Sequence, residues 1–172
     1  MNRLELAHAI GQTAKISGSF TLRSGAVSDS YFDKYRFESD PKLLALMAEA
    51  LAPLVPSQTD YLAGLELGGV PVATMLSNVT GIPAVFVRKQ AKTHGTCQLA
   101  EGADIKGQRL TIVEDVITSG GAVSDAVFAL RERGATVEQV ICIIDRESGG
   151  KENWSDPQNA DRGARDVAPV SP

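Results

Sequence analysis

Apolar residues recur near the start of the chain at the spacing of one helix face. That stripe predicts an N-terminal helix with its apolar positions at Leu4, Leu6, Ala7, Ile10 and Ala14. A second stripe, over residues 43–51, follows Asp40 and Pro41, which favour an N-cap and a first helical turn. Residues 20–37 lie between the two helices and predict short β-segments around a turn at Ser24-Gly25.

Beyond residue 60, continuous apolar runs alternate with helical stripes. The apolar runs are Tyr61–Leu65, Ala84–Val87, Leu110–Val113 and Val140–Ile144. Helical spacing covers about residues 70–79 and 123–130, with Gly81 and Gly134 as stops. Apolar strands that alternate with helices are typical of a parallel sheet covered on both faces. The sequence therefore predicts an α/β fold, with an irregular, proline-interrupted tail near its end.

Length, charge and cysteine usage narrow the function classes. A length of 172 residues suits one domain, and no apolar run reaches the roughly 18 residues of a membrane span. The net charge of −4 argues against a general nucleic-acid binder, so an anion site must be a local basic cluster. Two cysteines, Cys97 and Cys142, are too few for a disulfide-rich secreted domain, and the N-terminus does not look like a signal peptide. We expect a cytoplasmic protein.

The third apolar run leads into the strongest chemical feature. It delivers Glu114 and Asp115, then a turn with Thr118-Ser119, Gly120 and Gly121, and then a helix. Hydroxyls, glycines and a helix N-terminus suit a phosphate, whereas the carboxylates suit sugar hydroxyls or a metal-bound water. A sugar phosphate satisfies both halves. The alternative is a solvated strand end before an ordinary helix cap.

A basic segment follows the second apolar run. Four potential cations, Arg88, Lys89, Lys92 and His94, fall within seven residues, and no carboxylate lies among them. Such a loop in an acidic protein predicts a lid that captures a polyanion, although a solvated basic loop is the commoner explanation of a charge run.

Two further segments follow apolar runs. Glu66-Leu67-Gly68-Gly69 can bring glycines close to a pyrophosphate, and a plain tight turn explains it nearly as well. Asp145-Arg146 places an arginine where it can contact a carboxylate or imide, or pair with its own neighbour. The P-loop, dinucleotide, HExxH and GxSxG motifs are absent from the sequence.

Several of these segments together resemble one known family. The run Val113–Gly120 resembles the phosphoribosyl pyrophosphate (PRPP) signature of the type I phosphoribosyltransferases. The loop Arg88–Gly95 is similar to the catalytic loop of one branch, the orotate phosphoribosyltransferases. Thr21–Gly25, Tyr31-Phe32 and Asp145–Glu147 match that branch in the same order along the chain.

The resemblance implies a fold, a reaction and an assembly. The fold would be a type I phosphoribosyltransferase-like parallel sheet flanked by helices, in a domain over residues 1–153. A small N-terminal hood (about residues 1–40) would cover the base, the core would span about 41–147, and an irregular tail would follow over 154–172. The reaction would transfer the 5-phosphoribosyl group from PRPP to orotate, giving orotidine 5′-monophosphate and pyrophosphate with Mg²⁺, in UMP biosynthesis. The family's loop reaches into the neighbouring subunit's site, which implies a homodimer with shared sites.

The resemblance also implies a role for each matching residue. PRPP would be bound by the consecutive residues Glu114, Asp115, Val116, Ile117, Thr118, Ser119, Gly120, Gly121 and Ala122. In this set the two acids would hold the ribose hydroxyls, and the residues from Thr118 on would cradle the 5′-phosphate. Pyrophosphate would be held by the catalytic set Arg88, Lys89, Lys92 and His94. Orotate would contact Thr118, Arg146, Tyr31 and Phe32. Mg²⁺ would be held mainly by the substrate.

Two positions and one segment depart from the family's pattern. Arg23, a further candidate for substrate binding, stands where the family often has Lys, so the charge is kept but the geometry changes. Gly68 stands where many members have Lys. The segment 153–172 lacks the apolar closing strand with which members usually end.

Other functions share parts of this pattern. A purine-type phosphoribosyltransferase would carry the same signature with a different base-recognition segment. A regulatory relative would bind nucleotide or RNA without turnover, which the basic loop and the negative net charge disfavour. A catalytically inactive relative, disabled by the missing closing strand, is a third alternative. Hypoxanthine and adenine tested beside orotate separate a purine-type enzyme from an orotate enzyme.

Overall fold

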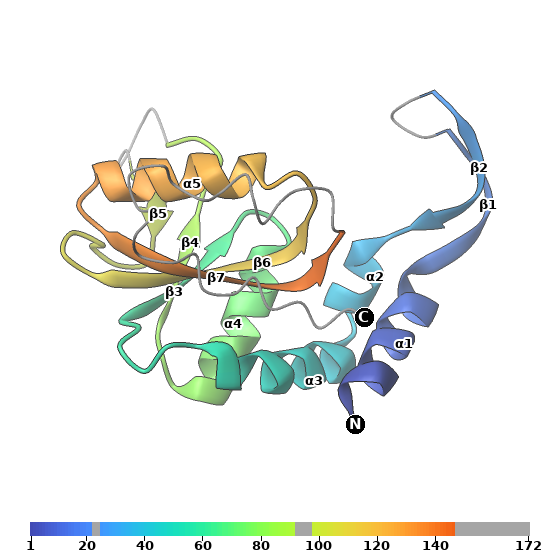
Figure 1. Ribbon diagram of the computed structural model, residues 1–172, viewed down its shortest axis with the longest axis horizontal. Helices are drawn as coiled ribbons and strands as arrows, with labels where there is room; N and C mark the ends of the chain where they lie inside the picture. The colour runs from blue at the N-terminus through green and yellow to red at the C-terminus, as the bar shows by residue number, and fades with distance from the viewer. Residues whose placement is uncertain (22–24, 92–97, 147–172) are drawn as a thin grey trace.

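The computed structural model describes residues 1–21, 25–91 and 98–146, and its elements form a hood and a core (Figure 1). The strands are β1 (Lys15–Thr21), β2 (Val27–Phe32), β3 (Tyr61–Leu65), β4 (Ala84–Val87), β5 (Ala100–Glu101), β6 (Arg109–Ile117) and β7 (Thr136–Asp145). The helices are α1 (Arg3–Ala14), α2 (Lys34–Glu38), α3 (Pro41–Leu51), α4 (Gly69–Thr80) and α5 (Gly121–Glu132), with a 3-10 turn η1 (Ala52–Leu54) after α3. None of these described helices is long and apolar enough to cross a membrane.

A five-stranded sheet in the order β5-β4-β3-β6-β7 forms the described part of the core. The strands β3, β4, β6 and β7 are parallel, and β5 runs antiparallel to β4. Helices α3 and α4 cover one face and α5 covers the other (Figure 1). Each face has its own buried cluster, in which Leu62 and Ile141 pack towards α4 while Ile112 and Val140 pack towards α5. The predicted α/β fold with helices on both faces is therefore confirmed.

Local signals in the sequence account for the starts of α1 and α3 and for the end of α4. Asn2 and Glu5 form a capping box at the start of α1. Asp40 accepts hydrogen bonds from the backbone N–H groups of Lys42 and Leu43, and so caps α3 as predicted. Gly81 ends α4 in the left-handed conformation, with φ 75°.

Two short elements were not predicted. The polar stretch after β4 contains β5, which pairs with β4 through Phe86 and Val87. The segment expected to hold only β-pieces ends in the helix α2, whose N-cap Asp33 accepts from the Tyr35 N–H. Both elements are too short to show a hydrophobic period, so their signals are lost in the pattern.

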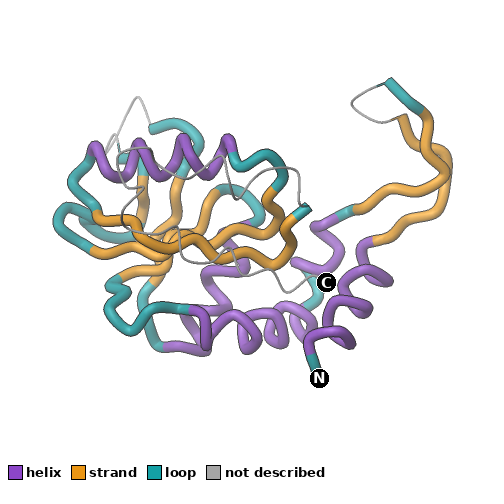
Figure 2. Tube along the Cα trace, viewed as in Figure 1, coloured by secondary structure: helices purple, strands orange, loops and turns teal. Residues whose placement is uncertain are grey.

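The hood consists of α1, the β1–β2 hairpin and α2. The hairpin is antiparallel, pairs Lys15 with Phe32, and projects away from the core (Figure 2). Buried side chains of α1 and α2, including Leu6, Ile10 and Phe37, join the cluster under α3. The hood is thus attached to the core by its helices. The predicted tail over 154–172 lies outside the described residues, and so does Arg23.

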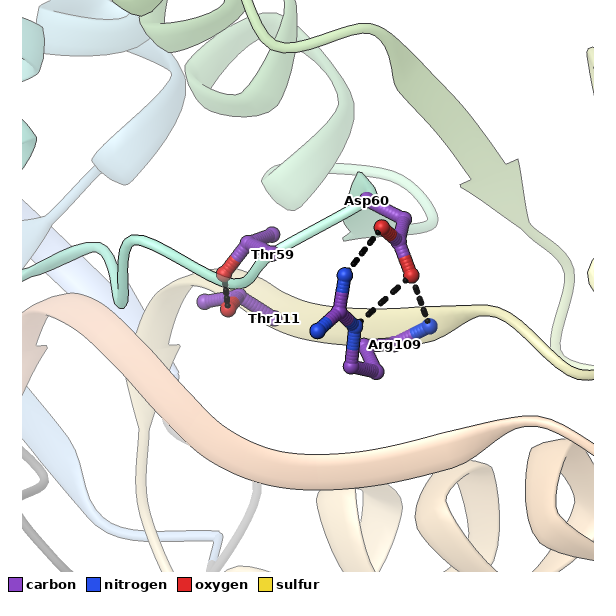
Figure 3. A network of polar contacts seen from close by, with 4 residues as sticks. All are labelled: Thr59, Asp60, Arg109 and Thr111. Carbon is purple, nitrogen blue, oxygen red and sulfur yellow. Dashed lines mark hydrogen bonds and ion pairs between the residues drawn. The ribbon is translucent and has the colours of Figure 1, made fainter.

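A polar network ties β3 to β6 at the N-terminal edge of the sheet (Figure 3). Arg109 donates from its backbone N, Nε and Nη2 to the Asp60 carboxylate, at 2.8, 3.0 and 2.8 Å. These hydrogen bonds lower the pKa of Asp60 to about 2. The hydroxyls of Thr59 and Thr111 lie 2.7 Å apart in a hydrogen bond. This edge fixes the register of the two strands that deliver the candidate site at their other ends.

Candidate active site

Parallel register brings four sequence segments to the carboxyl edge of the sheet. Leu65 pairs with Val87, and Ile117 pairs with Asp145, so the segments that follow these strands start side by side. The segments are the Glu66–Gly69 loop, the start of the basic loop, the turn before α5, and Arg146. Ligands of parallel α/β sheets bind at this edge. The segments singled out in the sequence therefore share one site, although Lys92 and His94 lie outside the described residues.

The acid pair lies within β6 rather than after it. The expected strand ended at Val113, but β6 continues to Ile117 because β7 is equally long and pairs Glu114 with Cys142 and Val116 with Ile144. Glu114 is half-buried, and Asp115 is 0% exposed. The strand therefore holds both acids on a rigid backbone instead of a flexible turn.

Helix α2 of the hood contributes two charged side chains beside the acid pair. The Lys34 ammonium lies 2.5 Å from Asp115 Oδ2, and the Lys34 side chain is 32% exposed. Glu38, one helical turn further on, is buried, and its Oε1 has no hydrogen-bond partner among the described residues. The site therefore contains three carboxyl groups and one ammonium in close proximity. Sequence analysis missed Lys34 and Glu38, since neither belongs to a motif or a periodic stripe.

Electrostatics divide the three carboxyl groups into different charge states. Burial raises the pKa of Glu114 to about 9, and the neighbouring Asp115 raises it as well. Burial and Asp115 likewise raise the pKa of Glu38. Burial also opposes ionisation of Asp115, but the adjacent carboxyl groups of Glu38 and Glu114 and the charge of Lys34 outweigh it and lower the pKa of Asp115. These shifts favour the neutral forms of Glu114 and Glu38 near neutral pH and favour Asp115 as the carboxylate that Lys34 balances.

The loop after β3 packs so closely against β6 that it requires glycine. A Cβ on Gly68 would lie 2.0 Å from Asp115 Oδ2, and a Cβ on Gly69 would lie 2.3 Å from the Val113 carbonyl oxygen. The peptide bond between Glu66 and Leu67 is cis. A lysine at position 68 would therefore displace the acid in its present position, which gives a physical reason for the departure from the family's pattern.

The described part of the basic loop is held by two acids. Glu66 Oε1 accepts a hydrogen bond from the Lys89 backbone N at 2.6 Å, which joins the loops after β3 and β4. Arg88 Nε donates to Glu101 Oε1 at 3.1 Å. Glu101 belongs to the unpredicted strand β5, so no pattern in the sequence indicated this pair. Arg88 and Lys89 thus start the loop from fixed positions at the edge of the site.

The turn before α5 leads into a helix N-terminus that has no side-chain cap within the described residues. Gly120 adopts a left-handed conformation with φ 76°. The N–H groups of the first turn and the helix dipole are favourable for an anion. Thr118, Ser119, Gly121 and Ala122 belong to the same turn and the first residues of the helix.

The predicted orotate contacts do not all lie together. Arg146 follows β7, and its backbone N donates to the Ile117 carbonyl at 2.9 Å beside Thr118. Tyr31 and Phe32 instead line a groove of about 630 Å³ between α1 and β2, and they are 47% and 40% exposed. This structure therefore brings Arg146 and Thr118 to the sheet edge, while contact of the aromatic pair with orotate stays a prediction.

The family was established by comparison with known proteins. A family model described as "Phosphoribosyl transferase domain" matches residues 36–162, most of the chain. The chain therefore belongs to the phosphoribosyltransferase family, as its motifs predicted.

Individual relatives narrow the branch. An orotate phosphoribosyltransferase of Nocardioides sp. is 55% identical over 151 residues, covering 88% of this chain and 84% of that protein. A crystal structure of the Mycobacterium tuberculosis H37Rv orotate phosphoribosyltransferase has a TM-score of 0.77 and 35% identity, covering 88% of this chain and 89% of that one. A structure of the same relative in complex with PRPP has a TM-score of 0.73 and 32% identity, covering 88% and 87%. Within the family, the chain is placed with the orotate phosphoribosyltransferases.

Proposed function

We propose that the chain transfers the 5-phosphoribosyl group from PRPP to orotate, giving orotidine 5′-monophosphate and pyrophosphate. The observation that carries the proposal is the convergence at one sheet edge of an acid pair, a glycine turn before a helix N-terminus, and the start of a basic loop. The relative from Mycobacterium tuberculosis with the same fold has been crystallised with PRPP. Purine transfer and binding without turnover remain outcomes of the test.

Each group at this edge suits one part of PRPP. In this proposal Glu114 and Asp115 would hold the ribose hydroxyls, and the N-terminus of α5 is suited to the 5′-phosphate. Arg88 and Lys89, with Lys92 and His94 further along the loop, supply positive charge for the departing pyrophosphate. The glycine loop after β3 lets backbone approach the same group.

Breakage of the bond to pyrophosphate passes through an oxocarbenium-like state, which needs stabilisation of the leaving group rather than a protein nucleophile. Arg146 offers a guanidinium at the end of β7, and such a group can bind the orotate carboxylate in a bidentate manner. A loop that closes over the site would exclude water, which competes with orotate for the ribosyl group.

We also propose that Mg²⁺ takes part as the counterion of PRPP. No set of three or more His, Cys, Asp or Glu side chains is arranged to hold a metal ion in the described part of the chain. Asp115 is moreover engaged by Lys34. These residues do not fit a metal site made by the protein alone, so the ion would arrive with the pyrophosphate of the substrate.

A homodimer in the cytoplasm completes the proposal. Three exposed apolar side chains line one groove of the hood, Leu4 at 70%, Tyr31 at 47% and Phe32 at 40%. Apolar side chains gathered at one place on the surface are typical of a protein interface, which supports a second copy of the chain as the partner.

The decisive experiment is the loss of orotate absorbance in the ultraviolet with PRPP and Mg²⁺ present. We expect depletion that requires both, and no consumption of hypoxanthine or adenine under the same conditions. Use of a purine would replace orotate as the substrate. Folded protein that binds PRPP but consumes no base would indicate a regulatory or inactive relative.

A further inference from the structure

The hood reaches the acid pair of the core through a single helix face. Lys34 and Glu38 are four residues apart on α2 and therefore lie on the same side of it. Lys34 contacts Asp115 at 2.5 Å, and Glu38 is buried next to both. These residues join segments that are about eighty positions apart in the chain.

Asp115 is confined from two sides. Lys34 approaches its Oδ2 atom from the hood, while the Gly68 backbone lies so close that even a Cβ there would collide with it. Neither carboxylate oxygen accepts a hydrogen bond from backbone or hydroxyl groups among the described residues. The position of Asp115 therefore depends on the Lys34 ammonium and on the two neighbouring carboxyl groups.

The charge of Asp115 depends on the same contact. A fully buried carboxylate is unfavourable unless a cation or several donors compensate it. The titratable or charged groups that face this cluster are Lys34, Tyr35 and Glu38 of α2, Asp33 at its N-cap, Glu114 on β6, and Cys142 and Asp145 on β7. Lys34 is the one cation in that set of described groups.

We propose that Lys34 is a positioning residue for PRPP binding, which holds Asp115 in place and charged and so makes the ribose site depend on the docked hood. The proposal rests on the proposed function, because it assigns the acid pair to the ribose hydroxyls. Lys34 acts through Asp115 and is not itself placed on the substrate. Removal of its charge leaves a buried carboxylate without a cation, and this carboxylate then takes up a proton.

The test compares PRPP binding by Lys34→Met, Lys34→Arg and the wild type, measured by calorimetry over a range of pH without orotate. Lys34→Met removes the charge but keeps much of the apolar stem, whereas Lys34→Arg keeps the charge. The matched control is Lys42→Met, at an exposed lysine on α3 that lies outside the cluster.

We expect Lys34→Met to bind PRPP about tenfold more weakly near neutral pH, which is the loss expected once the Asp115 carboxyl titrates about one unit above the pH of the assay. The pH below which its PRPP affinity falls, the acid limb of the curve of affinity against pH, should shift upwards, because a carboxyl without its cation ionises only at higher pH. Lys34→Arg should restore most of the affinity and the wild-type limb, and Lys42→Met should match the wild type.

Three results would overturn the proposal. In the first, Lys34→Met binds PRPP with wild-type affinity and its acid limb is unshifted. In the second, Lys34→Met loses the same factor in PRPP affinity at every pH, and Lys34→Arg does not restore it. If Lys34→Met does not fold, Lys34→Gln takes its place, and an unshifted limb there is the third. Wild-type protein that binds PRPP but consumes no orotate would refute the proposed function and leave this comparison intact.

Discussion

Gly68 and Gly69 offer a test of how the site is built, because alanine at each would meet a different kind of neighbour. At Gly68 the new Cβ would collide with the Asp115 side chain, at 2.0 Å from Oδ2. At Gly69 it would collide with backbone, at 2.3 Å from the Val113 carbonyl oxygen. We therefore expect Gly68→Ala to affect ligand binding most, and Gly69→Ala to affect stability most.

The magnitude for Gly68→Ala follows from two opposing effects. Gly68 has φ −69° and ψ −30°, a conformation that alanine adopts freely, so the substitution alone would stabilise by about 0.4–1 kcal/mol. Overpacking against Asp115 costs about 1–3 kcal/mol. The net loss in the free energy of unfolding should be about 1–2 kcal/mol. The Cβ of Gly69→Ala would meet backbone rather than a side chain that can move aside. The free energy of unfolding should therefore fall by about 3 kcal/mol, the upper end of that overpacking range.

The effect of Gly68→Ala on PRPP is larger than its effect on folding. Displaced Asp115 forfeits a charged hydrogen bond worth about 1.5–3 kcal/mol, so PRPP should bind about 10- to 100-fold more weakly. Urea unfolding gives the stabilities and calorimetry gives the affinities. Gly11→Ala is the matched control, because its Cβ would meet nothing within 4 Å. Wild-type PRPP affinity in Gly68→Ala would refute the close packing between this loop and the acid pair.

The remaining predictions concern the basic loop, the assembly and the far edge of the sheet. Lys92→Ala should slow turnover strongly and leave the unfolding curve unchanged, since the loop stabilises the leaving group; unchanged turnover would remove the loop from the mechanism. Mixing Lys92→Ala with Asp115→Asn chains should restore some activity if sites are shared, and confirmed heterodimers without recovery would contradict this. Asp60→Asn should lower the melting temperature near neutral pH. Because Arg109 depresses the pKa of Asp60, the higher melting temperature of the wild type should approach that of the variant as the pH falls below about 4 towards about 2. A difference in melting temperature that stays constant over this range would contradict the pairing of Asp60 with Arg109.

The sheet and its edge could be predicted because their signals are local. Each apolar run, cap and glycine stop lies within a few residues of the element that it defines, as Asp40 does for α3. The rule that ligands bind at the carboxyl ends of parallel strands then assembled Glu114, Arg88 and Arg146 without any knowledge of distances. The strand was wrongly expected to end at Val113, before the acid pair. Its length is set by pairing with β7 rather than by the composition of β6.

Contacts between distant segments left no comparable signal. Lys34 and Glu38 lie on a five-residue helix, and a charged residue there is expected on a solvated surface. Their burial against Asp115 arises only when the hood docks on the core. The pair Arg88–Glu101 likewise depends on β5, a strand of two residues. In both cases a partner outside the residue's own element decides what a charged side chain does.

The hood contact also resolves an electrostatic conflict within the proposed site. PRPP is a polyanion, and three ionised carboxyl groups beside its binding turn would repel it. Burial instead keeps Glu114 protonated at neutral pH and favours the neutral form of Glu38, while Lys34 balances the charge of Asp115. The cluster can therefore offer oxygen atoms to ribose hydroxyls without opposing the phosphates at α5. In the proposed site an acidic chain would bind an acidic substrate because the charges nearest the sugar cancel before the substrate arrives.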